Sequence, residues 1–178
     1  MKKWSKLMLL VGVLGLSACG FHLRGMGGTD RPMPFTTIHV VGDGTLVGPL
    51  NTVLKRNQNI QVVGAGQAEA SLEVLNEDAK REVMTINRGG SVNEYLYRFT
   101  ARAQLHKNGA PYGQPLNVSV RRTMDYTDRD VLGKEDEEGQ LWQEMRMDAA
   151  EQLVRRLAYI KPDATETADE QPAGLIRK

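Results

Sequence analysis

A stretch of 14 residues in the middle of the chain, from Asn93 to His106, constrains the fold most strongly. Apolar and polar side chains alternate along it, so that one face carries Tyr95, Tyr97, Phe99, Ala101, Ala103 and Leu105, and the other carries Glu94, Arg98, Thr100, Arg102 and Gln104. Successive side chains of a β-strand point to opposite faces, so this pattern predicts a strand with one face in a core and the other in water. Any fold for this chain must cover one side of a sheet and leave the other side polar.

The segment before this strand predicts a strand, a helix and a second strand. Residues Thr37–Val41 are mostly β-branched and are closed by a glycine, which indicates a short strand. Apolar residues then recur at helical spacing from Leu46 to about Asn57, and Ile60–Val63 forms a second short apolar run. This order predicts a right-handed crossover that joins two parallel strands.

The middle of the chain predicts a long hairpin. Two apolar runs, Leu72–Leu75 and Val83–Ile86, bracket a charged stretch, and we interpret them as one long strand that is bent or bulged near Asp78 to Lys80. The turn is Asn87-Arg88-Gly89-Gly90, and Lys107-Asn108-Gly109 is typical of a second hairpin turn.

The last elements complete the fold class. A strand is expected from Leu116 to about Tyr126, then a polar loop from Thr127 to Glu138, and then a helix from about Gly139 to Tyr159. The apolar stripe of this helix is Trp142, Met145, Ala149, Ala150, Leu153, Val154 and Leu157. The chain therefore predicts an α+β two-layer sandwich, with a mixed sheet of about four to five strands and two helices packed on one face.

The N-terminus has the order of an export signal. Lys2, Lys3 and Lys6 precede an apolar run, Leu7 to Leu16, that is about half of the ~20 residues needed to span a bilayer. The sequence Leu16-Ser17-Ala18-Cys19 resembles the lipobox of bacterial lipoproteins, and Cys19 is the chain's single cysteine. We therefore predict cleavage before Cys19 and anchoring through lipid on its thiol. By analogy with enterobacterial sorting, Gly20 in place of aspartate points to the outer membrane.

These features divide the chain into four parts. We expect a signal peptide at 1–18, a glycine-rich lipidated tether at 19–35, a folded domain at 36–161 and a disordered tail at 162–178. The mature chain of 160 residues would carry 20 basic and 22 acidic side chains, a net charge of −2. Nothing in this balance suggests a nucleic-acid partner.

Residues able to carry catalysis or bind a metal are sparse. Cys19 is used for lipid, and the histidines at 22, 39 and 106 fall in unrelated places. The acidic run Glu135–Glu138 fits a solvated loop before a helix, with calcium binding as the alternative. We expect no cofactor and no enzyme activity, and a hydrolase with scattered catalytic residues is the least favoured reading.

Four motifs carry a family resemblance. They are Cys19-Gly20-Phe21-His22-Leu23-Arg24, Gly48-Pro49-Leu50, Asn87-Arg88-Gly89-Gly90 followed by Glu94-Tyr95, and Ala149 to Leu157. In this order, over nearly the whole mature domain, they resemble the LPS-assembly lipoprotein family (LptE, also called RlpB). The resemblance implies a lipid-anchored protein on the periplasmic face of the outer membrane. It would sit as a plug in the β-barrel LptD, in a one-to-one complex, and help deliver lipopolysaccharide to the cell surface.

The resemblance also suggests roles for the polar strand face. Arg98, Arg102, Arg121 and Glu94 are candidates for contact with a hydrated barrel lumen, and simple solvation of this face is an equally open reading. The rival function is an envelope-structural or peptidoglycan-associated lipoprotein. Its usual paired Asp and Arg for a diaminopimelate carboxylate are not found here.

Topology places a candidate ligand site at one end of the sheet. In a three-strand meander, the turn at Arg88 and the loop that leaves the last strand share an end, so Arg88 is expected near Arg129 and Lys134. Such cations can bind the phosphates of a ligand without a deep pocket. The resemblance implies that the hairpin-tip arginine and the lysine before the acidic run contact lipopolysaccharide. The alternative is that these are ordinary solubilising charges, partly cancelled by the acidic run.

Overall fold

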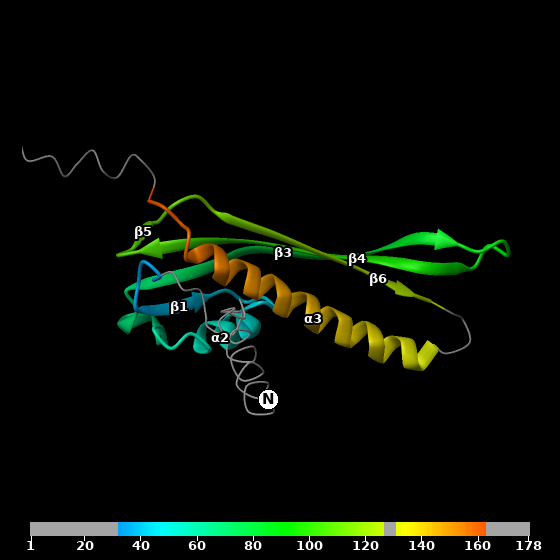
Figure 1. Cartoon of the computed structure of the whole chain (residues 1–178), viewed down its shortest axis with the longest axis horizontal. Helices are drawn as coiled ribbons and strands as arrows, with labels where there is room; N and C mark the ends of the chain where they lie inside the picture. The colour runs from blue at the N-terminus through cyan, green and yellow to red at the C-terminus, as the bar shows by residue number, and fades with distance from the viewer. Residues whose placement is uncertain (1–31, 127–130, 163–178) are drawn as a thin grey trace, which may run out of the picture.

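The computed structural model describes residues 32–126 and 131–162, and within them the chain forms a mixed sheet of six strands with two helices (Figure 1). This confirms the predicted α+β class, with one or two strands more than expected. The predicted signal peptide, Cys19 with most of the tether, Arg129 and nearly all of the predicted tail lie outside the described residues.

The sheet has the strand order β2-β1-β3-β4, and β4 pairs on its other side with β5 and β6. β1 runs parallel to β2, as the strand–helix–strand pattern predicted, and it also runs parallel to β3 on its other side. β4 is antiparallel to its three neighbours. The strands are β1 (Thr37–Val41), β2 (Gln61–Val62), β3 (Ala70–Ile86), β4 (Val92–Lys107), β5 (Ala110–Pro111) and β6 (Leu116–Asp125). The helices are α2 (Val47–Lys55), α3 (Val131–Leu157) and a 3₁₀ turn at Ala65–Gln67.

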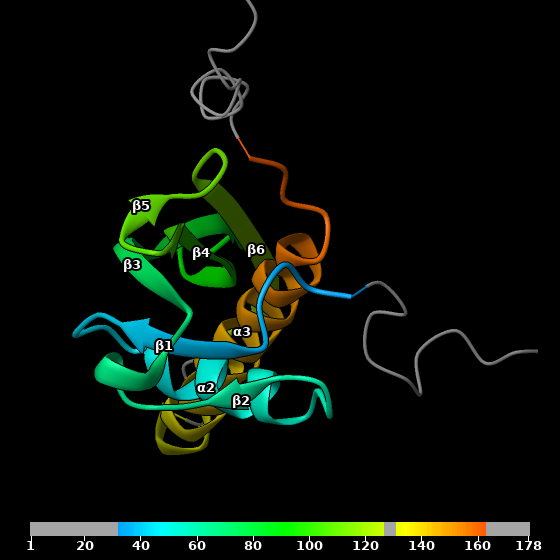
Figure 2. The same ribbon diagram turned by 90° about the vertical axis from the view of Figure 1, so that its left-hand side faces the viewer.

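Both helices lie side by side on one side of the sheet, as the views in Figures 1 and 2 show. The alternation along β4 sends its apolar side chains toward them, and Tyr97, Phe99 and Leu105 are almost completely buried there. The stripe of α3 packs on the same core, with Met145, Ala149, Ala150, Leu153 and Leu157 fully buried. The expected two-layer sandwich is therefore present, and no described helix covers the other face of the sheet.

α2 begins without a capping side chain of its own, and a carboxylate from β3 takes that role. The residue before the helix is Leu46, which has no side-chain acceptor. Glu77 instead accepts hydrogen bonds from the backbone N–H groups of Thr45 and Leu46, each at 3.0 Å. A carboxylate at this end satisfies N–H groups that have no partner within the helix and complements the helix dipole.

The bulge predicted near Asp78 to Lys80 is wrong. The pairing of β3 with β4 shifts between Val74 and Asn76 and again between Val83 and Thr85, while the charged middle pairs regularly with β4. The first shift reverses which face successive side chains take, so Val74 and Glu77 both point toward the helices. The charges at 78 and 80 alternate outward on a regular strand and need no irregularity.

The predicted start of the last helix is also wrong. α3 begins at Val131, eight residues before Gly139, so the acidic run Glu135–Glu138 lies in the helix and not in a loop. Glutamate is a good helix former, and the glycines at 133 and 139 are accommodated within the helix. The longer helix reaches further along the sheet than the sequence suggested.

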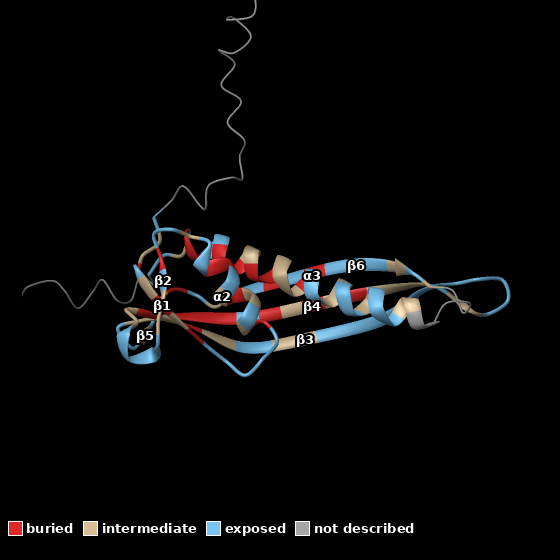
Figure 3. Cartoon of the chain, turned by 90° about the horizontal axis from the view of Figure 1, so that it is seen from below, coloured by how far each residue is buried: buried red, intermediate tan, exposed pale blue. Residues whose placement is uncertain are grey.

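Burial divides the molecule into two regions (Figure 3). The base comprises β1, β2, α2 and the parts of β3, β4 and α3 that pack against them. The arm is the end of the β3–β4 hairpin, Arg81 to Tyr95, and every residue from 81 to 90 is exposed. The arm extends beyond the start of α3 (Figure 1). Phe35, at the end of the predicted tether, is buried in the core of the base.

Candidate functional site

The sheet face opposite the helices, called here the outer face, holds the four residues predicted to contact a partner: Glu94, Arg98, Arg102 and Arg121. Arg98 and Arg102 alternate with buried inward residues of β4, Glu94 precedes the half-buried Tyr95, and Arg121 of β6 lies directly opposite Arg98. Glu94 lies opposite Asp125, and Arg102 lies opposite Asn117. The structure thus places all four on one face, and their role there stays a prediction.

Three cations form a row across the outer face. Lys80, Arg98 and Arg121 occupy directly paired positions on β3, β4 and β6. The first two have carboxylate partners, since Lys80 Nζ lies 3.3 Å from Asp78 and Arg98 Nη2 lies 3.7 Å from Glu82. Like charges in directly opposite positions destabilise a sheet. Arg121, at the edge, has no carboxylate within ion-pair distance among the described residues.

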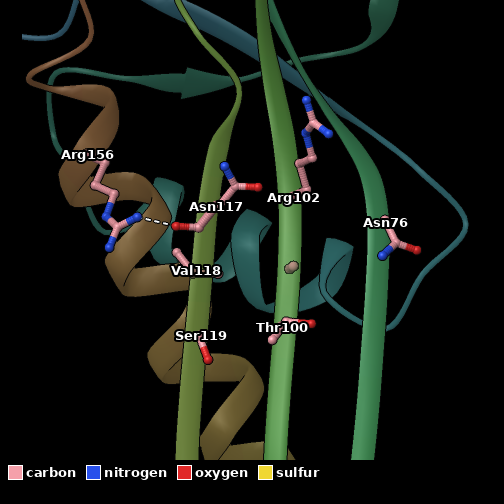
Figure 4. A pocket seen from close by; sticks show the side chains of 8 residues that line it. Asn76, Thr100, Arg102, Asn117, Val118, Ser119 and Arg156 are labelled. Carbon is pink, nitrogen blue, oxygen red and sulfur yellow. Dashed lines mark hydrogen bonds between the residues drawn. The ribbon is translucent and has the colours of Figure 1, made fainter.

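A shallow hollow of about 500 Å³ lies on the outer face beside this row (Figure 4). Its polar lining comes from three strands and the end of α3, where Arg156 reaches the edge of β6 and donates to the backbone carbonyl of Asn117. The lining residues are Asn76, Thr100, Ala101, Arg102, Asn117, Val118, Ser119 and Arg156. Hydroxyl, amide and guanidinium groups dominate it, which suits hydrated polar contact better than an apolar ligand.

The tip of the arm is a turn ordered by one side chain. Asn87 Oδ1 accepts from the N–H groups of Gly89 and Ser91, at 2.9 and 3.1 Å, and Gly90 takes a positive φ of 84°. This arrangement presents Arg88 at the exposed end of the hairpin. Exposed apolar side chains precede it: Val83 is 54%, Met84 53% and Ile86 65% exposed.

Lys134 lies at the same end of the molecule as Arg88 but not beside it. Arg81 contacts Glu138, and Lys134 is one helical turn, ~6 Å, nearer the tip, whereas Arg88 is roughly 20 Å further along the strand. Lys134 Nζ forms an ion pair with Glu137 at 2.5 Å. The end-to-end topology is as predicted, Arg129 lies outside the described residues, and contact of these three residues with one ligand stays a prediction.

Sequence reasoning missed the contacts that join the arm to α3. Arg81 Nη1 lies 2.6 Å from Glu138 Oε2 and stacks over the ring of Tyr95 at 4.8 Å, and Trp142 donates to the same carboxylate at 3.2 Å. Trp142 also meets the ring of Tyr97 edge-on at 5.3 Å. No sequence signal marks these contacts, because residues 81 and 138 are 57 positions apart.

The ionisation of this group follows from burial and charge. Burial raises the pKa of Tyr97, and the negative charge of Glu138 raises it further. Burial alone would lower the pKa of Arg81, but the hydrogen bond and charge of Glu138 outweigh it, so that pKa is raised. The guanidinium therefore stays charged where the arm meets the helix.

Each of the two described histidines contacts one neighbouring segment of the chain. His39 Nδ1 lies 3.0 Å from the carbonyl of Val63, and His106 Nε2 lies 3.1 Å from Glu73. Both pair in register with Ser71, so they are two strands apart, roughly 10 Å. Within residues 32–126 and 131–162, no group of three or more His, Cys, Asp or Glu could hold a metal ion. In the same ranges no helix has the length and apolarity to cross a membrane.

A protein-family model matches most of the chain. The model of the LptE, lipopolysaccharide-assembly, family matches residues 35–157. A protein of Pectobacterium atrosepticum named LPS-assembly lipoprotein LptE is 35% identical over 159 residues, covering 86% of this chain and 84% of that protein. A protein of the same name from Yersinia enterocolitica is 30% identical over 171 residues, covering 92% of this chain and 81% of that protein.

Solved structures share the fold. Lipoprotein B from Nitrosomonas europaea aligns with a TM-score of 0.61 at 22% identity, covering 84% of this chain and 94% of that chain. Rare lipoprotein B from Shewanella oneidensis aligns with a TM-score of 0.60 at 21% identity, covering 76% and 100%. At this identity the likeness concerns the fold alone.

Proposed function

The chain belongs to the LptE family of lipopolysaccharide-assembly lipoproteins, and from this premise we propose that it binds lipopolysaccharide and plugs the barrel LptD in a one-to-one complex. In this proposal it has no catalytic role. Lipid on Cys19 anchors it to the periplasmic face of the outer membrane. The protein assists assembly of the barrel and delivery of lipopolysaccharide to the cell surface.

The arm is the observation that carries this proposal. It projects from a well-packed base, keeps polar groups on its outer face and is exposed from residue 81 to 90. A water-filled barrel lumen is lined by polar side chains, so the polar outer face of the sheet suits contact with such a lumen. The outer face, with Arg98, Arg102 and Arg121 balanced in part by acids, supplies further polar contacts.

Arg88 supports the lipopolysaccharide part of the proposal. Its guanidinium stands on a turn ordered by Asn87, at the far end of the arm. A guanidinium can bind a phosphate through two parallel hydrogen bonds. Lys134, at the same end of the molecule, can contribute a second positive charge, and the exposed apolar residues beside the tip can contact acyl chains.

The binding test uses the full lipidated chain and purified lipopolysaccharide. Arg88→Asp combined with Lys134→Asp is expected to weaken binding at least about tenfold, since charge-assisted hydrogen bonds contribute about 1.5–3 kcal/mol each. The matched control is Lys55→Asp with Arg155→Asp, which makes the same charge change on the exposed surface of the base. Equal binding by both variants would remove the proposed phosphate site.

The partner test separates this function from a peptidoglycan-associated one. The full chain should co-purify with LptD in a one-to-one ratio, and its depletion should stop lipopolysaccharide from reaching the outer leaflet. Retention on peptidoglycan sacculi, together with normal surface delivery after depletion, would favour the rival. Mass spectrometry of the mature N-terminus tests the anchor, because an unlipidated Cys19 would contradict membrane attachment.

A further inference from the structure

Among the described residues, no strand pairs with β6 on the side away from β4, so β6 forms an edge of the sheet. Tyr126, directly after the strand, donates its N–H to the carbonyl of Asn93 at 2.9 Å. This bond shows which residues of β6 direct their backbone groups toward β4. In an antiparallel pair, alternate residues direct both backbone groups to the neighbour. The even-numbered residues of β6 therefore face β4, and the odd-numbered residues face outward: Asn117, Ser119, Arg121, Thr123 and Asp125.

This edge is only partly protected. Proteins commonly protect an edge strand with a proline, a bulge or a covering segment. β6 has no proline and no bulge, and no strand pairs beyond it among the described residues. Two arginines cover outward carbonyls: Arg156 donates to Asn117, and Arg122 donates to Arg121 at 3.0 Å.

The outward N–H groups have no such cover. None of the five has an acceptor among the described residues, and a carbonyl that already accepts one bond keeps a second lone pair. The edge therefore offers donors and acceptors at regular spacing, as an added strand requires. The stretch from Ser119 to Asp125 lies beyond the reach of the Arg156 contact.

The charges on the outer face indicate which side chain a strand added beside β6 would carry opposite Arg121. In the row across the outer face, Lys80 and Arg98 each have a carboxylate nearby, and Arg121 at the edge has none among the described residues. A strand placed beside β6, roughly 4.8 Å away, would bring one of its side chains directly opposite Arg121. An acidic residue there would complete the pattern that the two inner strands already show.

We propose that the open edge of β6 binds an extended segment of the barrel partner as an added β-strand, with a carboxylate opposite Arg121. The edge adjoins the outer face at Arg121, so a partner that covers this face also reaches the edge. The inference rests on the proposed function and makes it specific, because it assigns main-chain pairing to one strand.

The test changes the outward N–H groups without touching the ladder. Ser119→Pro with Thr123→Pro removes two outward donors, and proline is tolerated where a strand's N–H faces away from its neighbour. Ser119→Ala with Thr123→Ala keeps both donors and serves as the matched control. After co-expression with LptD, the proline variant is expected to co-purify at least about tenfold less than wild type, and the alanine variant equally well. Circular dichroism of each isolated variant checks its fold.

A charge change tests the same edge without proline. Arg121→Glu should reduce the amount of protein that co-purifies with LptD. Arg121→Lys, which keeps the positive charge, should co-purify nearly as well as wild type. Hydrogen exchange then locates the pairing. The amides of Ser119, Arg121, Thr123 and Asp125 should exchange fast in the isolated full chain and at least about tenfold slower in the complex.

The outcomes that overturn the inference are distinct. Equal co-purification of proline and alanine variants, or unchanged exchange in the complex, would remove the added strand and leave the proposed function standing. Slow exchange already in the isolated chain would mean that another part of the same chain covers the edge. Slowing that increases with protein concentration would mean that a second copy pairs with the edge. Failure of wild type to co-purify with LptD would overturn the proposed function and this inference together.

Discussion

The base and the arm share two strands, β3 and β4, yet the two regions differ sharply in burial. In the base, β3 lies between β1 and β4, and Leu72 is fully buried under the helices. Fourteen residues later on the same strand, Ile86 is 65% exposed. Hydrophobic burial stabilises the first region and is nearly absent from the second.

The contrast indicates that the two regions contribute differently to stability. A region with few buried apolar contacts adds little to the free energy of folding, so its side chains can contact other molecules without loss of stability. Within the arm, main-chain pairing of β3 with β4 holds the hairpin together. The Arg81–Glu138 contact joins the arm to α3. Substitutions in the two regions should therefore separate stability from function.

The largest expected difference is between two residues of β3. Leu72→Ala should lower the free energy of unfolding by about 2–5 kcal/mol, because it leaves a cavity in the base. Ile86→Thr keeps a β-branched side chain on the exposed arm and should change the same quantity by no more than about 0.5 kcal/mol. Urea unfolding followed by circular dichroism measures both. Similar losses in the two variants would mean that the arm is a structural part of the core.

A smaller effect is expected where β3 caps α2. Glu77→Ala should destabilise the protein by about 1–2 kcal/mol, because two N–H groups at the helix start lose their acceptor. Glu77→Gln keeps one acceptor oxygen and should cost less. The same unfolding experiment compares them, and no loss in either variant would show that water replaces the carboxylate without cost.

The smallest effect is a pH dependence confined to the base. Glu69 accepts from the N–H of Thr36 at 3.0 Å and contacts Lys107 Nζ at 3.1 Å, and both interactions lower its pKa below the ordinary 4.5. A carboxyl whose pKa is lower in the folded state contributes stability above pH 4.5 that is lost as pH falls through the folded pKa. The contribution is modest, because this side chain is 34% exposed.

Thermal unfolding between pH 7 and pH 3 measures this dependence. Wild type should lose melting temperature below about pH 4.5 more steeply than Glu69→Gln, which should start lower at pH 7. Glu144→Gln, on the exposed side of α3, is the control and should follow wild type. Parallel curves for wild type and Glu69→Gln would contradict the assignment.

Local patterns in the sequence predicted the elements of both regions well. The strict alternation from Asn93 to His106 identified β4 and its outer face, because successive residues of a strand point to opposite faces. The phase of β3 was not predictable in the same way, since two bulges reverse which side chains face the helices. The polar composition of the acidic run predicts a loop, although Glu135–Glu138 lies inside α3.

Long-range partners could not be predicted from local patterns. Glu77 caps a helix 31 residues away, and Arg81 meets Glu138 only because α3 begins early enough to reach the arm. Topology predicts Arg88 and Lys134 at one end of the sheet, and their offset of roughly 15 Å follows from the length of the arm beyond the helix. The open edge of β6 depends on ladder phase, which the sequence alone does not reveal.

The order of pairing has a consequence for how the molecule acquires its shape. β3 and β4 are joined by a five-residue turn, whereas β1 meets β3 in parallel with positions 38 and 70 paired. Short-range closure is faster than long-range closure, so the hairpin should form early and the parallel pairing late. A newly made chain would then form the arm before the parallel strands of the base have paired.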